Sequence, residues 1–401
     1  MSARLVLGSP AARWHDTEVR HYRLISGDSH VNEPPDLFVS RVPTALKDRV
    51  PRIEHFPEGD AWVIEGANDP INFGMNACAG QGPDELRGWV RFEDIRHGGY
   101  DPVARLDEMD TDGVDAEILY PTPRLCQGIV ANPDPELHVA MVRAYNDWLS
   151  DYVAHAPDRF GGLLLLPNCD SAAAAAELQR VAGRPGIRGA VMGCYPNGTL
   201  DVTDKDDRVW AALVEHTLPV SIHVSLGRTM PEAHRSSLPG YGRFFDVPNR
   251  IVQMIFSGMF DRFPDLQLVC AEVDCGWVPY FKEQVDNNFH RLYSPGATTV
   301  RGLPSEYVER HVSFTYVTDG IGIDNRHLIG VDRILWSSDY PHISADWPNS
   351  WKTIQATFAG VSAADRSAIL AGNAARLYGF DSPSSSSTAE IASTSLTSSS
   401  R

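Results

Sequence analysis

The sequence predicts an α/β fold of the (β/α)8 TIM-barrel type, and three observations support this. Short apolar runs alternate with helical stretches over most of the 401 residues. Several runs, such as Gly161–Leu166, are apolar throughout, which is typical of parallel strands covered on both faces. In all, the sequence contains eight short apolar runs that can form strands, and eight strands are the number that closes this kind of barrel. A doubly wound open sheet is the alternative.

The individual elements follow from apolar patterning and from helix start and stop signals. The expected strands are Arg23–Ser26, Ala116–Tyr120, Gly161–Leu166, Gly189–Met192, Pro219–His223, Gln267–Ala271, Val312–Tyr316 and Arg333–Trp336. The expected helices are Pro102–Met109, Pro135–His155, Ser171–Val181, Asp206–His216, Val247–Met259, Trp277–His290 and Asn325–Leu328. Asp134 and Ser171 are typical helix starts, and Gly183 and Gly330 stand where helices should stop.

The chain divides into an N-terminal arm at 1–22, a barrel at 23–380 and a Ser/Thr-rich tail at 381–401. We expect the tail to be disordered, because it has too little apolar surface to bury. An insertion at about residues 36–100 breaks the βα alternation with a pattern of short antiparallel strands and turns. Since the insertion follows the first strand, we predict that it lies on the catalytic face as a substrate-covering lid.

Three aromatic residues of the insertion allow two interpretations. Trp62, Phe73 and Trp89 can form an apolar wall over an aromatic substrate, or they can be the insertion's own small core.

Composition excludes several classes of partner. The formal net charge is −17, so neither nucleic acid nor an anionic membrane surface is expected to bind. The six cysteines form no CxxC pair, which favours reduced thiols. No signal peptide and no apolar stretch of about 18 residues is present. We therefore expect a soluble cytoplasmic protein with a small-molecule substrate, assembled as a homo-oligomer or with a related barrel subunit.

Three strand ends carry residues that can bind a metal. Asp28 and His30 are two residues apart after the first run, so on an extended chain they point to the same side. His223 ends the fifth run, and Asp339 follows the eighth. A lone strand-end His or Asp is usually a core or cap residue. Three of them together indicate a metal centre, because barrel strand ends converge on one site.

With these motifs the chain resembles the amidohydrolase-2 group, which contains aminocarboxymuconate-semialdehyde decarboxylase, resorcylate and related aromatic-acid decarboxylases, and some hydrolases. The resemblance covers Leu24 to Phe380. It is carried by Asp28-Ser-His-Val-Asn-Glu33-Pro, Pro219-Val-Ser-Ile-His223, Phe263-Pro-Asp-Leu, Ala271-Glu272, Gly276-Trp277-Val-Pro-Tyr-Phe, Trp336-Ser-Ser-Asp339-Tyr-Pro-His342 and Gly372-Asn-Ala-Ala-Arg-Leu-Tyr. It implies a zinc or manganese ion bound by Asp28, His30, His223 and Asp339, of which His223 and Asp339 are also counted as catalytic.

The chain departs from this group at two positions. Many members begin with His-x-His or Glu-x-His, whereas this chain has Asp28. Decarboxylases of the group often have a histidine at the end of strand six, where this chain has Glu272. Glu272 can handle the proton in its place. Alternatively, Glu272 can hold a second metal ion together with Glu33 and His342.

Two further features concern Glu33 and the substrate. Glu33 is either a ligand of that second ion or a cap on the following segment at Pro34. Arg228 and Arg243 are candidates for binding a substrate carboxylate, as arginine does with both nitrogens of its fork, or are ordinary surface residues.

These features predict a metal-dependent enzyme that acts on a small carboxylate-bearing or aromatic substrate by non-oxidative decarboxylation or hydrolysis. One alternative is a non-haem di-iron-type oxygenase on the same barrel, with one or two iron ions. Another is a non-catalytic partner subunit of such an enzyme.

Overall fold

The computed structural model describes residues 20–67, 69–228, 242–292 and 300–380. Most of the expected N-terminal arm lies outside these ranges, as does the whole of the expected tail at 381–401.

Eight parallel strands form one sheet in chain order, from β1 through β5–β10 to β11. The strands are β1 (Ile25–His30), β5 (Ala116–Tyr120), β6 (Phe160–Leu165), β7 (Ile187–Met192), β8 (Val220–His223), β9 (Leu268–Ala271), β10 (Val312–Tyr316) and β11 (Ile334–Trp336). The predicted barrel is confirmed. The sequential order rules out the doubly wound alternative, in which the strand order reverses.

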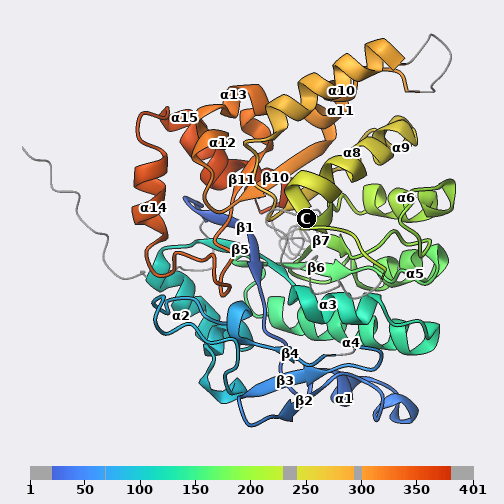
Figure 1. The fold of residues 1–401 in the computed structure, drawn as a ribbon, viewed down its shortest axis with the longest axis vertical. Coiled ribbons are helices and arrows are strands. Elements are labelled where there is room, and N and C mark those ends of the chain that lie inside the picture. The colour runs from blue at the N-terminus through green and yellow to red at the C-terminus, as the bar shows by residue number, and fades with distance from the viewer. Residues whose placement is uncertain (1–19, 68, 229–241, 293–299, 381–401) are drawn as a thin grey trace, which may run out of the picture.

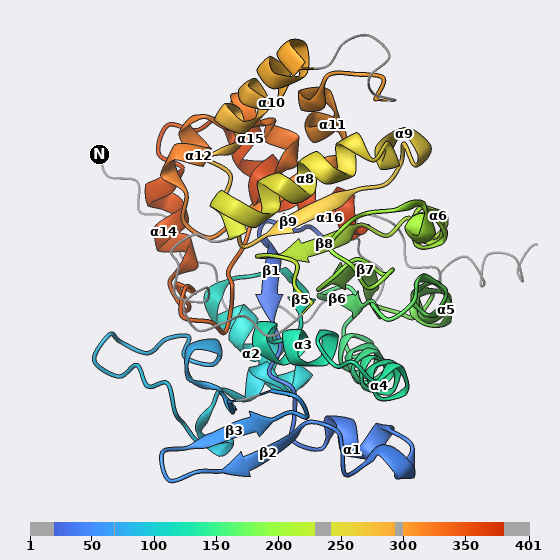
Figure 2. The same cartoon turned by 45° about the vertical axis from the view of Figure 1, so that its right-hand side comes forward.

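Helices surround the strands, as Figures 1 and 2 show. They are α1 (Leu37–Arg41), α2 (Pro102–Asp112), α3 (Pro123–Val130), α4 (Pro135–Val153), α5 (Ser171–Val181), α6 (Asp207–Glu215), α8 (Val247–Phe256), α9 (Met259–Arg262), α10 (Val278–Leu292), α11 (Pro304–His311), α12 (Gly320–Asp324), α13 (Arg326–Ile329), α14 (Ser350–Thr357), α15 (Ala363–Ser367) and α16 (Asn373–Tyr378). Asp134 caps α4 by accepting from the backbone N–H groups of Glu136 and Leu137. In the described part of the chain, no helix has both the length and the apolar character that a membrane crossing requires.

The prediction of one helix over Val247–Met259 is wrong. Helix α8 ends at Phe256, and α9 begins at Met259. Between them Gly258 adopts a left-handed conformation with φ of 70°, which a residue without a side chain reaches at little cost and which commonly ends a helix.

The interior of the barrel is apolar and closely packed. Leu163, Leu164 and Leu165 of β6 are all fully buried, as expected of a strand covered on both faces. The six cysteines are unpaired, and all except Cys169 are buried.

Individual hydrogen bonds, rather than a ladder of strand pairing, close the barrel between β1 and β11 in the described chain. The amide of Asp339 donates to the carbonyl of Asp28 at 2.9 Å, and the amide of His30 donates to the carbonyl of Tyr340 at 2.7 Å. The amide of Ser338 donates to the hydroxyl of Ser26 at 2.9 Å. This seam therefore joins the segments that carry the predicted metal ligands of β1 and β11.

The insertion contains a three-stranded antiparallel sheet of β2 (Arg52–His55), β3 (Asp60–Val63) and β4 (Ile71–Asn72), which confirms its predicted antiparallel strands. The sheet lies beside α1 at one end of the molecule (Figure 1). Trp62 is 1% exposed and makes edge contacts with Phe38 and Phe73. Trp62 and Phe73 therefore belong to the insertion's core, while Trp89 packs on Phe56.

We predict that Trp62→Ala lowers the free energy of unfolding by about 3–5 kcal/mol, the usual cost of removing a large buried aromatic side chain. Urea denaturation measures this, and the KM of the enzyme should change little. A raised KM with unchanged stability would instead indicate that Trp62 lines the substrate site.

Candidate metal centre

The predicted ligands meet at the carboxyl ends of the barrel strands. The expected end of the first strand at Ser26 is too early, because pairing with β5 resumes beyond an irregularity and continues to His30. Asp28 and His30 therefore lie within β1, His223 is the last residue of β8, and Asp339 follows β11. The four side chains fall into two overlapping groups of possible ligands that share His30: Asp28 with His30 and His223, and Asp339 with His30, Glu272 and His342.

The distances within this cluster suit a shared divalent cation. The Nε2 atom of His30 lies 3.1 Å from Nε2 of His223, 3.5 Å from Oδ1 of Asp28 and 3.3 Å from Oδ1 of Asp339. Ligand atoms held about 2.0–2.2 Å from one metal ion are typically separated by about 3–3.5 Å. Oδ1 of Asp28 and Oδ1 of Asp339 are buried and accept no hydrogen bond from the described residues. A cation would satisfy both of these orphaned oxygens.

Both histidines are held in the neutral form that binds metals. Nδ1 of His30 lies 3.0 Å from the carbonyl of Pro121, and since a carbonyl only accepts, Nδ1 carries the proton and Nε2 offers its lone pair to the cluster. Burial lowers the pKa of His30 to about 4, with a further contribution from His342. Burial, followed by the nearby His30, also places the pKa of His223 well below its ordinary value.

The carboxyl groups divide into two kinds. Burial raises the pKa of Asp28 well above its ordinary value, and the charges of Asp339 and Glu272 raise it further. The pKa of Glu272 is also raised well above its ordinary value, first by burial and then by the charge of Asp339. Burial also raises the pKa of Asp339, but the effects of His342 and His30 are larger and hold this pKa below its ordinary value. The Asp339 carboxyl is thus the most readily ionised of the three.

Glu272 enters the cluster directly after β9. Its Oε2 lies 3.2 Å from Nε2 of His223, and its backbone φ is 55°. Asp339 and Val224, which also follow barrel strands, have positive φ values of 54° and 57°. Non-glycine residues in this left-handed region cost about 1–3 kcal/mol each and are common at functional sites. The chain therefore turns sharply at three of the strand ends that surround the cluster.

His342 and Glu33, the two other candidate ligands of a second metal ion, lie in different surroundings. Nδ1 of His342 lies 3.0 Å from Oδ1 of Asp339, its ring stacks on His30 at 3.8 Å, and its Nε2 is buried without a hydrogen-bond partner in the described structure. His342 can thus join a ligand set with His30, Glu272 and Asp339. Glu33 belongs to neither ligand set among the described residues.

Glu33 instead holds the start of a helix. Its Oε1 accepts from the amide of Thr122, the residue before α3, at 3.0 Å. The interpretation of Glu33 as a cap on the segment at Pro34 is wrong, because its partner comes from a distant part of the chain. Burial raises the pKa of Glu33 to about 7, against the opposing hydrogen bonds from Thr122.

The two candidate substrate arginines differ in position. Arg243 forms an ion pair with Asp274, and its charge acts on the Glu272 carboxyl. Its Nε is buried without a hydrogen-bond partner in the described chain. Arg228 is exposed, and none of the contacts seen among the described residues joins it to the cluster.

Three residues at the site were not identified from the sequence. The hydroxyl of Thr315 donates to Oδ2 of Asp28 at 3.2 Å and accepts from the amide of Glu272 at 2.8 Å. The ring of Tyr120 lies against His223, with centroids 5.3 Å apart. Cys78 of the insertion is close enough for Asp339 to raise its thiol pKa, after the larger effect of burial. Tyr120 is the last residue of a predicted strand, and this position could have identified it as a site residue. Thr315 and Cys78 have no such feature in the sequence.

Cys78 belongs to a segment of the insertion that reaches the mouth of the barrel. Cys78 and Ala79 both donate their amides to the carbonyl of Pro341, each at 3.0 Å, and the amide of Ile343 donates to the carbonyl of Met75 at 3.0 Å. The insertion is thus attached to the chain that follows Asp339.

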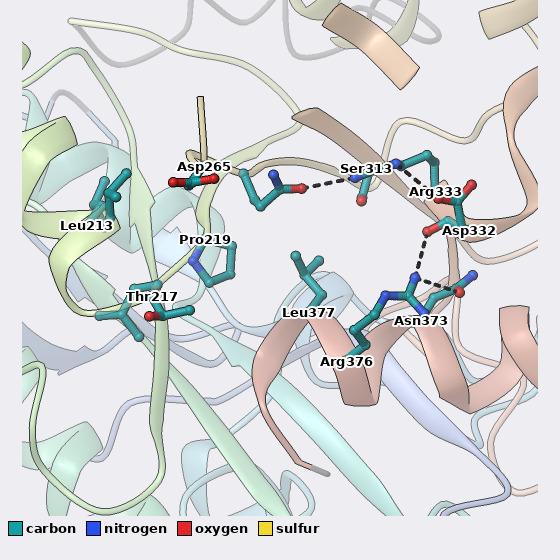
Figure 3. Close-up of a pocket in the computed structure, with 13 residues that line it drawn as sticks. Leu213, Thr217, Pro219, Asp265, Ser313, Asp332, Arg333, Asn373, Arg376 and Leu377 are labelled. Carbon is teal, nitrogen blue, oxygen red and sulfur yellow. Dashed lines mark hydrogen bonds and ion pairs between the residues drawn. The ribbon is translucent and has the colours of Figure 1, made fainter. Parts of the chain in front are cut away.

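A cavity of about 480 Å3 lies at the opposite end of the barrel. Figure 3 shows part of its lining, including Pro219, which precedes β8, and Arg333, which precedes β11. These are the amino ends of the strands, whereas the ligand cluster lies at the carboxyl ends. The cavity is therefore separate from the candidate metal centre, and in barrels of this kind catalysis takes place at the carboxyl ends.

A sequential eight-stranded parallel barrel with buried histidines and carboxylates at its carboxyl ends defines a metal-dependent barrel enzyme. The chain belongs to the amidohydrolase family, whose model matches residues 89–380. The match begins after the insertion's sheet, so it includes His223, Glu272 and Asp339 but not Asp28 and His30.

Similar proteins extend the comparison to almost the whole chain. A gamma-resorcylate decarboxylase from Rhodococcus jostii is 26% identical over 355 residues, which cover 84% of this chain and 100% of the relative. The structure of an amidohydrolase from Mycobacterium avium subsp. paratuberculosis has a TM-score of 0.68 and 23% identity, covering 90% of this chain and 98% of that one. A dihydroxybenzoic acid decarboxylase from a Polaromonas species, with bound manganese and the inhibitor 2-nitroresorcinol, has a TM-score of 0.64 and 21% identity, covering 90% and 98%.

We predict that Glu33→Gln stabilises the metal-free protein at pH 8. The folded state holds the Glu33 proton more tightly than the unfolded chain, so this group makes stability fall as pH rises from about 4.5 to about 7. Glutamine has no proton to lose and can still accept from Thr122. We expect a gain of about 1–3 kcal/mol at pH 8 that disappears near pH 4.5, measured by urea unfolding with a chelator present.

The same variant tests the second-metal assignment. If Glu33 serves only Thr122, metal content per chain stays as in the unaltered protein. Loss of one metal equivalent would make Glu33 a ligand and contradict this interpretation.

Proposed function

We propose that the protein is a metal-dependent carboxy-lyase that removes a carboxylate group from a small aromatic acid without oxidation. The observation that carries this proposal is Glu272, a partly buried carboxyl beside a cluster suited to a divalent cation, whose pKa is raised first by loss of solvent. A carboxyl with a raised pKa is the kind of group that can protonate a carbon.

The relatives support the same chemistry. The Rhodococcus jostii protein is named as a gamma-resorcylate decarboxylase, and the Polaromonas enzyme binds manganese. We extend to this chain an aromatic acid as substrate class, and manganese or zinc as the metal. The proposed ligands are Asp28, His30, His223 and Asp339. A divalent cation bound there would act as a Lewis acid toward the oxygen atoms of the substrate.

In the proposed reaction the bond between the ring and its carboxylate carbon breaks and CO2 leaves. The electron pair that remains on the ring carbon takes up a proton from Glu272, which is later reprotonated from solvent. Oε2 of Glu272 lies 3.2 Å from Nε2 of His223, so the carboxyl stands at the edge of the proposed ligand set. Glu272 thus stands at the strand end where decarboxylases of the amidohydrolase-2 group often have a histidine.

Arg243 is the proposed partner of the substrate carboxylate. Its charge acts on the Glu272 carboxyl, and its side chain is 35% exposed, so part of the guanidinium can be reached from solvent. Arg228 remains a second candidate. We further propose that the insertion covers the substrate through the segment that contains Cys78, and that the protein assembles as a homo-oligomer.

The comparisons lend no support to the two alternatives, the di-iron-type oxygenase and the non-catalytic subunit. The oxygenase also requires a second ion, and Glu33, one of its three proposed ligands, lies in neither group of possible ligands among the described residues.

The activity is tested with the manganese-loaded protein and a panel of hydroxylated benzoates that includes gamma-resorcylate. We expect one CO2 released for each substrate consumed, with no uptake of oxygen. His223→Ala should lose metal and activity while keeping a native circular dichroism spectrum, because a strand-end ligand contributes little to the apolar core. Stoichiometric oxygen consumption would instead establish the oxygenase.

We predict that Glu272→Gln keeps its bound metal and loses about 10²- to 10⁴-fold in rate, the usual contribution of a general acid or base. Metal analysis and steady-state kinetics on the same preparation measure both quantities. Glu283→Gln, the same change at an exposed position of α10 whose side chain accepts from Gln284, is the control and should retain the rate. A loss of metal in Glu272→Gln would make Glu272 a ligand rather than the proton donor.

A further inference from the structure

Arg105 of α2 is completely buried beneath the metal centre. Its Nη1 donates to the backbone carbonyl of His30 at 2.9 Å and to that of Gly98 at 3.3 Å. Its Nη2 donates to the carbonyl of Tyr340 at 3.5 Å, and the guanidinium lies 4.4 Å from the centre of the Tyr340 ring. One side chain thus contacts the backbone of β1, the segment after β11 and the end of the insertion.

Glu117 of β5 fixes this guanidinium in place. Its Oε2 accepts from Nε of Arg105 at 2.6 Å, and neither side chain is more than 3% exposed. The other oxygen of Glu117 accepts from the hydroxyl of Ser29 at 3.4 Å, and Ser29 in turn bonds to Ser26 at 2.8 Å. This buried network therefore runs from α2 through β5 and β1 to the seam of the barrel.

Two of the three contacted carbonyls, those of His30 and Tyr340, belong to segments that carry proposed metal ligands. His30 is itself a ligand, and Tyr340 is the residue after Asp339. Since single hydrogen bonds rather than a strand ladder join β1 to the segment after β11, the separation of His30 and Asp339 depends on contacts of this kind. The planar guanidinium offers five N–H donors in a fixed geometry, so it can bind both segments and Glu117 at once.

We propose that Arg105, held by Glu117, is a positioning residue that sets the spacing of the metal ligands across the barrel seam. The proposal rests on the proposed metal centre. It goes beyond it, because Arg105 touches neither the ligand side chains nor the substrate site and acts only through the backbone that carries His30 and Asp339.

The test compares Arg105→Lys with Arg159→Lys. Lysine keeps the charge but has no fork with which to bind both segments and Glu117. Arg159 is the matched control: it is also largely buried, and it donates to the carbonyls of Val114 and Asp115 and to Asp110, at the amino end of β5. Co2+ is the probe. Its dissociation constant is measured by chelator competition and its coordination by the visible absorption spectrum, both well below the melting temperature of each variant.

We expect Arg105→Lys to raise the Co2+ dissociation constant by about 10- to 100-fold, the usual effect of losing an outer partner of a metal site, and to change the spectrum. Arg159→Lys should lower the melting temperature without either effect. If Arg105→Lys does not fold, Glu117→Gln, which keeps the guanidinium but removes its anchoring charge, should weaken Co2+ binding in the same way.

Two results would overturn the proposal. One is wild-type Co2+ affinity and spectrum in folded Arg105→Lys, and the other is an equal loss of affinity in Arg159→Lys. Failure of the unaltered protein to bind metal would overturn the proposed metal centre together with this inference. Metal binding without decarboxylation would overturn only the proposed reaction.

Discussion

The architecture of the site depends on the close approach of three carboxyl groups that have lost much of their contact with solvent. Asp28, Glu272 and Asp339 meet at one end of the barrel, where little solvent screens their charges. Loss of solvent disfavours the ionised form of each, and only for Asp339 do neighbouring histidines outweigh it. Two responses are open to such a cluster: it keeps protons, or it binds a cation. A cluster that keeps protons needs raised pKa values, which Asp28 and Glu272 have. A cluster that binds a cation needs oxygen atoms without hydrogen-bond partners, which Asp28 and Asp339 have.

The backbone around these carboxyl groups adopts unfavourable conformations and depends on a few specific hydrogen bonds. Glu272 directly after β9 and Asp339 three residues after β11 adopt left-handed conformations, and Thr315 bridges the β9 end to Asp28. The seam between β1 and β11 relies on a few hydrogen bonds. The barrel can accept this local cost because its stability comes mainly from the apolar layers of the strands, away from the cluster.

The two ends of the barrel consequently differ in character. At the carboxyl ends, ionisable side chains converge and the insertion is attached to the chain after Asp339. At the amino ends, a separate cavity is lined by a mixture of apolar residues and satisfied polar ones, such as Asn373, whose amide donates to two carbonyls. Membership of the amidohydrolase family fits this division, since function in that fold class is built on the loops and residues that follow the strands.

The sequence by itself determined the barrel and the approximate position of every strand, and it predicted four candidate ligands that lie in two groups sharing His30. These were predictable because parallel strands buried on both faces leave uninterrupted apolar runs, and because His223 and Asp339 stand where such runs end. Only the tertiary structure showed that β1 extends to His30, that Glu33 accepts from the residue before α3, and that Thr315 and Cys78 lie beside the candidate ligands. The contacts of Arg105 with the backbone of His30 and Tyr340 were likewise visible only there. Their contacts join segments far apart in the chain, through backbone carbonyls and seam hydrogen bonds that leave no local pattern. Burial decided the rest, because the protonation of Glu272 depends on how the neighbouring strands enclose it and not on its neighbours in sequence.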